Sequence, residues 1–586
     1  MKRKTKIICT LGPATDDPNV LRELMLCGMN TARINFSHGT YDEHLKRINM
    51  VKELREELGL PIPLLLDTKG PEIRTGNFKD GLVELVQGQS FRLTPRDIEG
   101  DNTITSISYP GLSRDVEKGT KVLIDDGLIE MVVTEIDGKD IVCEVLNGGP
   151  VSNHKSINLP DVNLTMDYMS QKDIDDIKFG IEQGFDYIAA SFVRSAFDVL
   201  EIKRILEQNG GDDIQIIAKI ENRQGVDNVD HIIRVCNGIM IARGDMGVEI
   251  PFEELPAIQK ESIKKCYRSG KRVITATQML ESMTHNPRPT RAETSDVANA
   301  VYDGTSAVML SGETAVGQYP IRALKSMAQI CIKAEEDIDY IKRFENWHFN
   351  PGMSVTNAIS HSACTTAHDL GAAAIVTVSK SGFTPRVISG FRPSCPIIAG
   401  CMSERVYRQL ALSWGVTPIR TQMKKTSDAL FAHAVETALE NTSLIEKGDI
   451  IVITGGAPVG VSGTTNILKV ELVGDVLLSG TSVSNKSVCG TVCVAKNTAE
   501  ALKNFKDGDI LVIPETSNDI ITLLRKASAI ITEKQGLSSH AAVVGMTLDI
   551  PVICGAAGAT KILKNGTTIT IDGGRGQVYS GVAKII

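Results

Sequence analysis

The sequence is poor in aromatic residues and has no long apolar run. Only 4% of its 586 residues are aromatic, with 2 Trp and 10 Tyr. No segment approaches the roughly 18 uninterrupted apolar residues that a membrane-spanning helix needs. The net charge is −8, and no basic patch with interleaved aromatic residues is present, which argues against nucleic-acid binding. We therefore expect neither a membrane nor a nucleic acid as a partner.

Clustered cysteines are also missing. The twelve Cys are scattered, and the nearest pair, Cys489 and Cys493, has no matching second pair, so a zinc site is not indicated. The apolar stretch near the N-terminus is broken by Gly12-Pro13 and is too short for a signal peptide. These features predict a cytoplasmic protein with reduced thiols.

What the sequence does contain is a regular alternation of short apolar segments and helical patterns. Each apolar segment ends in polar residues or glycine. The eight segments are 5–15, 31–39, 63–70, 187–193, 216–222, 238–245, 272–279 and 306–314. Continuously apolar strands that alternate with helices indicate a parallel sheet. Eight such units predict a (β/α)8 barrel, whose chemistry would lie at the C-terminal ends of the strands.

The remaining segments have a different pattern of apolar and turn residues and predict further domains. The length of the chain also predicts more than one domain. Repeated Asp-Gly and Asn-Gly turn signals after the third strand indicate an inserted antiparallel β-domain, which we interpret as a hinged cap over the barrel mouth. The overall class is α/β. The expected parts are a barrel of 1–70 and 169–345, a cap of 71–168, an α/β domain of 346–475, a Ser/Gly-rich linker of 476–487 and a final domain of 488–586.

Polar residues gather at the ends of the apolar strands. Lys219 and Glu221 lie two residues apart in "IQIIAKIENRQG" and therefore point to the same side of a strand. Burying unpaired charge costs several kcal/mol, so the two residues form a structural ion pair or face a ligand. Four other strand ends carry Arg33, Asn35 and Ser37; Asp67; Arg243, Gly244 and Asp245; and Thr275 and Thr277.

Five polar strand ends in register favour a ligand site over a buried ion-pair network that only stabilises the barrel. Glu221 and Asp245 are hard anionic ligands that suit Mg²⁺ and leave positions for substrate oxygens. Lys219 and Arg33 would neutralise a phosphate. Gly244 would let a ligand approach the backbone.

A family resemblance rests on seven motifs. They are "TARINFSHG", "DTKGPEIRTG", "IAKIENRQGVDN", "MIARGDMGVEI", "TATQMLESM", "PTRAETSDVANAV" and "SGETAVGQYP". Over about residues 1–475 the chain resembles pyruvate kinase, and its last domain is similar to the mobile phosphohistidine domain of enzymes that use phosphoenolpyruvate. The resemblance implies a glycolytic, allosterically regulated homotetramer that transfers the phosphoryl group of phosphoenolpyruvate to ADP, giving pyruvate and ATP.

The resemblance also implies residue roles at the rim. Glu221 and Asp245 would hold Mg²⁺ or Mn²⁺, Lys219 would stabilise the phosphoryl group in transfer, and Arg33 would contact the substrate phosphate. The backbone at Gly244 and Asp245, together with Thr277, would receive the substrate carboxylate, and Thr277 with a water chain would deliver a proton. The implied K⁺ ligands are Asn35, Ser37, Asp67 and Thr68, with Glu72 accompanying K⁺ dependence, and the implied nucleotide contacts are Arg74, His38 and Asn35.

Two other functions compete with this one. A phosphoenolpyruvate dikinase also combines a barrel with a swivelling histidine domain, but it needs an ATP-grasp domain for which the chain has no room. A catalytically silent sensor would bind the same ligands, but the intact set of Lys219, Glu221, Asp245 and Thr277 argues against it.

The stretch "IVTVSKSGFTPRV" predicts a strand, a polar turn and a helix with Thr384 as N-cap and Pro385 at its first position. Backbone N–H groups at such a start bind phosphate, and related pyruvate kinases hold an effector phosphate in this loop. The expected effector-phosphate residues are Ser379, Lys380, Ser381, Gly382 and Thr384. The expected second loop, 454–466, has no Lys, Arg or Trp, so we expect a sugar monophosphate or AMP rather than fructose bisphosphate.

In the last domain, "EKQGLSSH" places His540 where the related domains carry a phosphorylated histidine, although those usually have Thr before it. Two interpretations remain for His540, a phosphoacceptor or part of a folded appendage that transfers no phosphate. The sequence shows no donor site for this histidine, which favours the second.

Overall fold

The computed structural model describes residues 3–346, 354–457, 465–474 and 476–583. The chain forms two compact units. The first comprises Met1–Met353, Ser379–Pro393 and Cys401–Arg420, and the second comprises Ser354–Val378, Ser394–Gly400 and Thr421–Ile586. Within the described residues, no helix is both long and apolar enough to cross a membrane.

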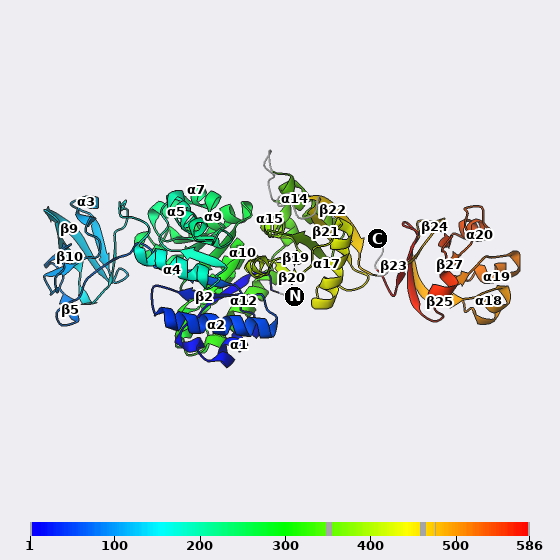
Figure 1. Cartoon of the computed structure of the whole chain (residues 1–586), viewed down its shortest axis with the longest axis horizontal. Helices are drawn as coiled ribbons and strands as arrows, with labels where there is room; N and C mark the ends of the chain where they lie inside the picture. Colours follow the sequence, from blue (N-terminus) through cyan, green and yellow to red (C-terminus); the bar gives the residue numbers. More distant parts are fainter. Residues whose placement is uncertain (1–2, 347–353, 458–464, 475, 584–586) are drawn as a thin grey trace. The chain divides into compact units, whose positions relative to one another are not determined.

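The centre of the first unit is a closed barrel of eight parallel strands in the order β1-β17-β16-β15-β14-β13-β3-β2. Figure 1 labels β2 of this barrel among the surrounding helices. The strands are β1 (Lys6–Thr10), β2 (Thr31–Asn35), β3 (Leu64–Asp67), β13 (Tyr187–Ala190), β14 (Gln215–Ile220), β15 (Gly238–Ala242), β16 (Arg272–Ala276) and β17 (Ala307–Leu310). Each predicted apolar segment overlaps one of them, β14 beginning one residue before its segment, so the predicted (β/α)8 barrel is confirmed.

Side chains along each barrel strand alternate between two apolar environments. On β14, Ile216, Ala218 and Ile220 pack toward the surrounding helices, whereas Ile217 packs in the barrel interior. Because strand side chains alternate, Lys219 follows Ile217 on the interior side. The apolar filling of the barrel thus ends in a charged residue at the C-terminal rim.

Helices surround the barrel, and several of them have polar N-caps. In α2 and α10, the capping residues Thr40 and Thr290 each accept a backbone N–H from a glutamate three residues on, which bonds back in return. The helices of this layer are α1 (Pro18–Leu26), α2 (Tyr41–Leu58), α4 (Gln171–Glu182), α5 (Ala196–Gln208), α6 (Arg223–Asp227), α7 (Val229–Val235), α8 (Arg243–Glu249), α9 (Leu255–Arg268), α10 (Arg291–Asp303), α11 (Gly312–Ala315), α12 (Pro320–Glu336) and α13 (Tyr340–Glu345).

Between β3 and β13 the chain forms β-structure with its own apolar core, which includes Phe91, Met131 and Ile141. One sheet has seven strands and a second has two, β11 and β5. The elements are β4 (Ile73–Arg74), β5 (Leu82–Leu85), β6 (Ser90–Thr94), β7 (Ile104–Ser106), α3 (Leu112–Asp115), β8 (Lys121–Ile124), β9 (Ile129–Asp137), β10 (Asp140–Asn147), β11 (Gly149–Ser152) and β12 (Ser156–Asn158). The strand pairs are antiparallel apart from β6 and β7.

The α/β segment after the barrel contains β18 (Ala374–Ser379), which pairs in parallel with β21 (Ile450–Gly456). Strand β22 (Thr465–Leu472) then pairs antiparallel with β21. The other elements are α14 (Val355–Asp369), α15 (Phe383–Phe391), β19 (Ile397–Cys401), α16 (Glu404–Leu410), β20 (Val416–Arg420) and α17 (Ser427–Asn441).

The last part of the second unit is an eight-stranded sheet. Its strands are β23 (Val476–Ser479), β24 (Thr481–Ser482), β25 (Val488–Val494), β26 (Ile510–Ile513), β27 (Ala529–Thr532), β28 (Val552–Cys554), β29 (Thr568–Asp572) and β30 (Gln577–Ser580). Helices α18 (Thr498–Asn504), α19 (Ile521–Leu524), α20 (His540–Leu548) and α21 (Ala559–Ile562) accompany it.

This sheet corrects the predicted linker of 476–487. Strand β23 pairs with β30, and β24 pairs with β28, so much of the segment is part of the folded domain. Gly480 serves close packing here, because a Cβ on it would lie 2.5 Å from the Cys554 carbonyl oxygen. The Ser/Gly composition was interpreted as flexibility, but small residues also let two backbones approach each other.

Candidate active site

The ammonium group of Lys219 lies at the centre of a buried polar cluster at the barrel rim. Its Nζ is 3.1 Å from Asp67 Oδ1, 2.8 Å from Ser191 Oγ and 2.9 Å from Glu221 Oε1. Asp67 ends β3, Ser191 follows β13, and Glu221 follows β14. Three neighbouring strand ends therefore place these groups around one cation, as the alternation of side chains predicts for Lys219 and Glu221.

Arg33 on β2 adds a second cation to the cluster. Its Nε lies 2.6 Å from Asp67 Oδ2, and its Nη1 donates to Thr10 Oγ1 at 2.9 Å. Asp67 thus links two cations through its two oxygens. An arginine and a lysine held side by side by one carboxylate supply two cationic donors that suit a phosphate group.

The electrostatics of the cluster follow from burial and close charge. Burial alone would lower the pKa of Lys219, but the carboxylates of Asp67 and Glu221 raise it overall. Burial opposes ionisation of Asp67 too, yet Arg33 and Lys219 bring its pKa below the usual value. These groups therefore keep their charges at neutral pH despite their burial.

Glu221 differs from Asp67 in being incompletely compensated. Burial raises its pKa to about 8, because the loss of hydration outweighs the attraction of Lys219 and Asp245 adds a smaller repulsion. Its Oε2 accepts the Phe192 backbone N–H at 2.6 Å, while the fully buried Oε1 accepts no hydrogen bond and is held only by the ion pair with Lys219.

A divalent cation near Glu221 and Asp245 would remove the repulsion between these carboxylates. It would also give the Glu221 Oε1 atom, which accepts no hydrogen bond, a partner. Among the described residues, no group of three or more His, Cys, Asp or Glu side chains could hold a metal. Two carboxylates with open positions are instead typical of Mg²⁺, which keeps waters and binds substrate oxygens. The residues present therefore fit a magnesium site that the substrate completes.

Strand β15 is shorter than the predicted segment of 238–245. The strand stops at Ala242, and Arg243–Glu249 is helical, so Arg243 and Asp245 do not share a strand face. Gly244 and Asp245 lie in the first turn of α8, where no helical carbonyl precedes the backbone N–H groups to accept them.

Thr277, which follows the neighbouring strand β16, contacts the start of α8. Its Oγ1 accepts the Gly244 N–H at 2.7 Å and donates to the Ala276 carbonyl at 2.6 Å. Thr275 does not accompany it, because Thr275 lies in β16 and is buried against Thr305, with 3.0 Å between the two hydroxyls. Thr277 instead follows the strand with a positive φ of 64°. The structure therefore brings Gly244 and Thr277 together but leaves Thr275 in the core.

The residues expected to bind K⁺ also lie at neighbouring strand ends. Asn35 and Asp67 are paired residues of β2 and β3, and Thr68 follows Asp67 directly. Asn35 Oδ1 accepts the Ser37 N–H at 3.1 Å. Their side chains supply oxygens, the donor type that a hard monovalent cation requires.

The expected nucleotide contacts are less closely grouped. Arg74 on β4 forms a 2.8 Å ion pair with Glu72, and His38 is exposed after β2. A cavity of 220 Å³ is lined by both Glu72 and Asp245, together with Arg194, Asn222 and Arg223, but neither Arg74 nor His38 lines it. The structure therefore associates Glu72, rather than Arg74 or His38, with the space beside Asp245.

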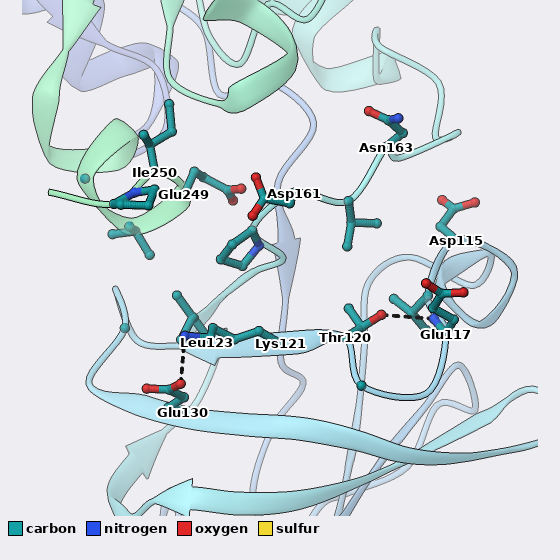
Figure 2. Close-up of a pocket in the computed structure, with 18 of the residues that line it drawn as sticks. Asp115, Glu117, Thr120, Lys121, Leu123, Glu130, Asp161, Asn163, Glu249 and Ile250 are labelled. Atoms are coloured by element: carbon teal, nitrogen blue, oxygen red, sulfur yellow. Dashed lines mark hydrogen bonds and ion pairs between the residues drawn. The ribbon is translucent and has the colours of Figure 1, made fainter. Parts of the chain in front are cut away.

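A larger cavity, of 1180 Å³, shares Asp161 and Glu249 with the smaller one but is lined by none of Arg33, Asp67 and Lys219. Figure 2 shows Glu249 and Asp161 with their carboxylates close together in it, and burial raises the pKa of Glu249, with Asp161 adding repulsion. Its lining includes Asp115, Glu117, Asp126, Glu130, Asp161, Glu249 and Glu253, but of basic residues only Arg114, Lys118 and Lys121. This excess of carboxylates does not suit a phosphorylated substrate, so size alone does not identify the active site.

Sequence reasoning missed Ser191 and Phe192. Ser191 Oγ donates to the Thr68 carbonyl at 2.6 Å and also contacts Asp67 and Lys219. Phe192 has a positive φ of 53° and directs its N–H at Glu221. The polar end of "YIAASFV" was visible in the sequence, but a serine and a phenylalanine give no charge signal.

Comparisons with known proteins agree with this geometry. Family models match residues 2–324 as "Pyruvate kinase, barrel domain", 357–471 as "Pyruvate kinase, alpha/beta domain" and 505–576 as "PEP-utilising enzyme, mobile domain". The chain belongs to the pyruvate kinase family. It is 50% identical over 586 residues to pyruvate kinase of Bacillus licheniformis and 49% identical over 588 residues to that of Geobacillus stearothermophilus, each comparison covering 100% of both chains.

A solved structure supports the same family. A pyruvate kinase from Cryptosporidium parvum aligns with a TM-score of 0.76 and 40% identity, covering 80% of this chain and 96% of that one. The barrel with its inserted β-structure is thus the architecture of the pyruvate kinase family.

The loop expected to hold an effector phosphate begins where β18 ends. Helix α15 starts at Phe383 with Gly382 as its N-cap, and Gly382 has a left-handed φ of 71°. This corrects the expected N-cap of Thr384, which lies inside the first turn and is buried. Glycine occupies the N-cap position because only glycine adopts the left-handed backbone conformation without strain. The expected second loop, 454–466, lies partly outside the described residues.

His540 begins α20 and has two neutral partners. Its Nδ1 lies 2.8 Å from Thr516 Oγ1, and its Nε2 lies 2.9 Å from Asn518 Oδ1. The Asn518 amide oxygen can only accept, so Nε2 donates to it. Both ring nitrogens are therefore engaged.

Proposed function

We propose that the cluster around Lys219 is the site at which this protein transfers the phosphoryl group of phosphoenolpyruvate to ADP, giving pyruvate and ATP in glycolysis. The observation that carries the assignment is the buried Lys219 ammonium between the carboxylates of Asp67 and Glu221, with Arg33 beside it. Phosphoryl transfer needs positioning and charge neutralisation more than covalent chemistry, and this cluster supplies both.

The residues of the site then divide the tasks of binding and charge neutralisation. Arg33 binds the substrate phosphate, and Lys219 stabilises the charge that moves with the phosphoryl group. The N–H groups at the start of α8, at Gly244 and Asp245, bind the carboxylate with the Thr277 hydroxyl. Glu221 and Asp245 would hold Mg²⁺ or Mn²⁺, which supplies charge neutralisation to the phosphoryl and enolate oxygens when bound.

Protonation completes the reaction. Breaking the bond between phosphorus and the enol oxygen leaves the enolate of pyruvate, whose terminal carbon must take up one proton. The Thr277 hydroxyl lies 2.7 Å from the Gly244 nitrogen, beside the proposed carboxylate position, so it orients the water that delivers this proton. Asn35, Ser37, Asp67 and Thr68 would hold K⁺ beside the phosphate, and Arg74, His38 and Asn35 would contact the nucleotide.

Turnover of phosphoenolpyruvate and ADP tests this assignment. Pyruvate formation, coupled to lactate dehydrogenase, should require Mg²⁺ or Mn²⁺ and should rise when K⁺ replaces a tetraalkylammonium salt. Thr275→Val is a matched control for Thr277→Val, because Thr275 is a buried threonine of the same strand end without a proposed role. A wild-type protein with no pyruvate above background would show that this site is not catalytic.

We also propose that the loop Ser379–Thr384 binds the phosphate of a sugar monophosphate or AMP. The loop precedes the N-terminus of α15, a helix of nine residues, and such a terminus with Ser379, Lys380 and Ser381 attracts an anion. The Ser381 side chain is partly exposed and Lys380 is exposed, so both are accessible to a ligand.

Ser381→Glu should abolish activation by the monophosphate and leave the maximal rate unchanged, because a carboxylate repels phosphate at this position. The measurement is saturation with phosphoenolpyruvate with and without each effector, and Ser381→Ala serves as the uncharged control. Stronger activation of the wild type by fructose bisphosphate would contradict the monophosphate preference.

The cellular setting is proposed as the cytoplasm and the assembly as a homotetramer. None of the twelve cysteines, all of them among the described residues, forms a disulfide, and ten are buried, which agrees with a reducing compartment. Light scattering of the purified protein measures the assembly directly.

A further inference from the structure

The turn that follows β16 holds two adjacent residues in the left-handed region. Thr277 has φ of 64° and Gln278 has φ of 52°, and neither is a glycine. A β-branched residue such as threonine is a steric outlier in this region. Such strain persists only where the surrounding structure enforces it, so some neighbour must stabilise this turn.

Arg243, the first residue of α8, is that neighbour. Its Nη2 donates to the Thr277 carbonyl at 2.9 Å, and its Nε lies 3.4 Å from the Ala276 carbonyl. Its Nη1 lies 2.6 Å from Asp296 Oδ1 on α10, and the arginine side chain is only 14% exposed. A planar guanidinium bonded on both sides fixes its partners more rigidly than a lysine ammonium would.

The direction of the Thr277 hydroxyl depends on this turn. Had the strand continued, Thr277 would have shared the face of Thr275, which is buried against Thr305. The left-handed turn instead aims the Thr277 hydroxyl at the Gly244 N–H, at 2.7 Å. The strain therefore places the hydroxyl at the helix start where the carboxylate is proposed to bind.

We propose that Arg243, anchored by Asp296, is a positioning residue for the reaction. It stabilises the strained turn through the carbonyls of Ala276 and Thr277 and thereby fixes the Thr277 hydroxyl for the substrate carboxylate. The proposal rests on the assignment of Thr277 made above. Arg243 acts through Thr277 and needs no contact with the substrate.

Arg243→Lys tests the proposal, since lysine keeps the charge but cannot bridge two carbonyls and a carboxylate. The KM for phosphoenolpyruvate should rise about tenfold or more, and kcat should fall, because a small misplacement of a binding group is costly. The KM for ADP should stay unchanged. Arg22→Lys is the control, because Arg22 forms a two-bond pair with Glu57 on the exposed surface and should change no kinetic constant.

Rescue by glycine separates positioning from general destabilisation. Gln278→Gly places at the second strained position a residue that adopts a left-handed backbone freely. In the wild type, this substitution should change kcat/KM little. In Arg243→Lys it should raise kcat/KM about fivefold, because it relieves the strain at one residue. Circular dichroism and thermal unfolding of each variant establish that the chains compared are folded.

Three outcomes would overturn the proposal. The first is an unchanged KM for phosphoenolpyruvate in Arg243→Lys, and the second is an equal effect of Gln278→Gly in both backgrounds, which means that the two sites are not coupled. The third is an equal rise in the KM for ADP. Thr277→Ala in the same series distinguishes the underlying assignment: if it leaves the KM for phosphoenolpyruvate unchanged, the role of Thr277 fails, and with it the proposal for Arg243.

Discussion

The barrel rim and the His540 site both carry residues that a motif predicts to be functional, yet they hold charge differently. At the rim, Lys219 is 8% exposed and Glu221 is fully buried, and both are close to other charged groups. His540 is partly exposed and has the neutral partners Thr516 and Asn518.

The difference shows how much an arrangement reveals about function. Buried charges lose hydration free energy, and a buried ion pair is often no more stable than apolar residues of similar volume. A buried charge cluster that lowers the gain in stability in this way indicates a role other than folding. A histidine with two neutral hydrogen bonds costs little and occurs in many folded domains, so its geometry favours no function by itself.

Removing the central cation should have the largest effect. Lys219→Met is expected to lower kcat by about a thousandfold, as for loss of a main electrostatic stabiliser. Because Asp67 and Glu221 are then left buried without their cation, the free energy of unfolding should also fall, by about 3–5 kcal/mol. Coupled turnover and urea unfolding measure the two effects. Turnover close to that of the wild type would remove Lys219 from the mechanism.

Removing one anionic ligand should have a smaller, more specific effect. Glu221→Gln should weaken Mn²⁺ binding by about tenfold or more, because an amide replaces a hard anionic ligand. The binding is measured by the paramagnetic signal of free Mn²⁺. Glu254→Gln, which breaks only the partly exposed ion pair with Arg223, is the control. Equal affinities in Glu221→Gln and the wild type would mean that the metal binds elsewhere.

Deleting the C-terminal domain should change turnover little if the comparison between the two sites is right. The cut must follow Gly474, because β23 and β24 belong to the final sheet. The shortened chain should fold and keep its kcat, since domain boundaries have few crossing interactions. A folded chain that has lost its activity would show that the final domain takes part in the reaction.

The smallest effect is expected at His540. His540→Asn should leave kcat and both KM values unchanged, because Thr516 and Asn518 already engage its two ring nitrogens. Incubation of the wild type with ³²P-labelled phosphoenolpyruvate should give no acid-labile label on the protein. Label that disappears in His540→Asn would identify a phosphohistidine and reverse the comparison.

The sequence determined the barrel and much of its rim. Parallel strands buried on both faces must be apolar, so each strand is visible as an apolar segment. All eight strands of a barrel run in one direction, so the polar residues at their C-terminal ends must converge. Local alternation then sufficed to place Lys219 beside Glu221.

Only the tertiary structure decided the features that depend on residues far apart in the chain. Ser191 forms a hydrogen bond with Lys219 because β13 lies beside β14. Gly480 packs against Cys554 rather than forming a flexible linker. Thr277 adopts a strained backbone because Arg243, from another strand end, bonds its carbonyl. Strand periodicity extends only to the last residue of a strand, and beyond it the backbone follows its long-range partners, which no local pattern records.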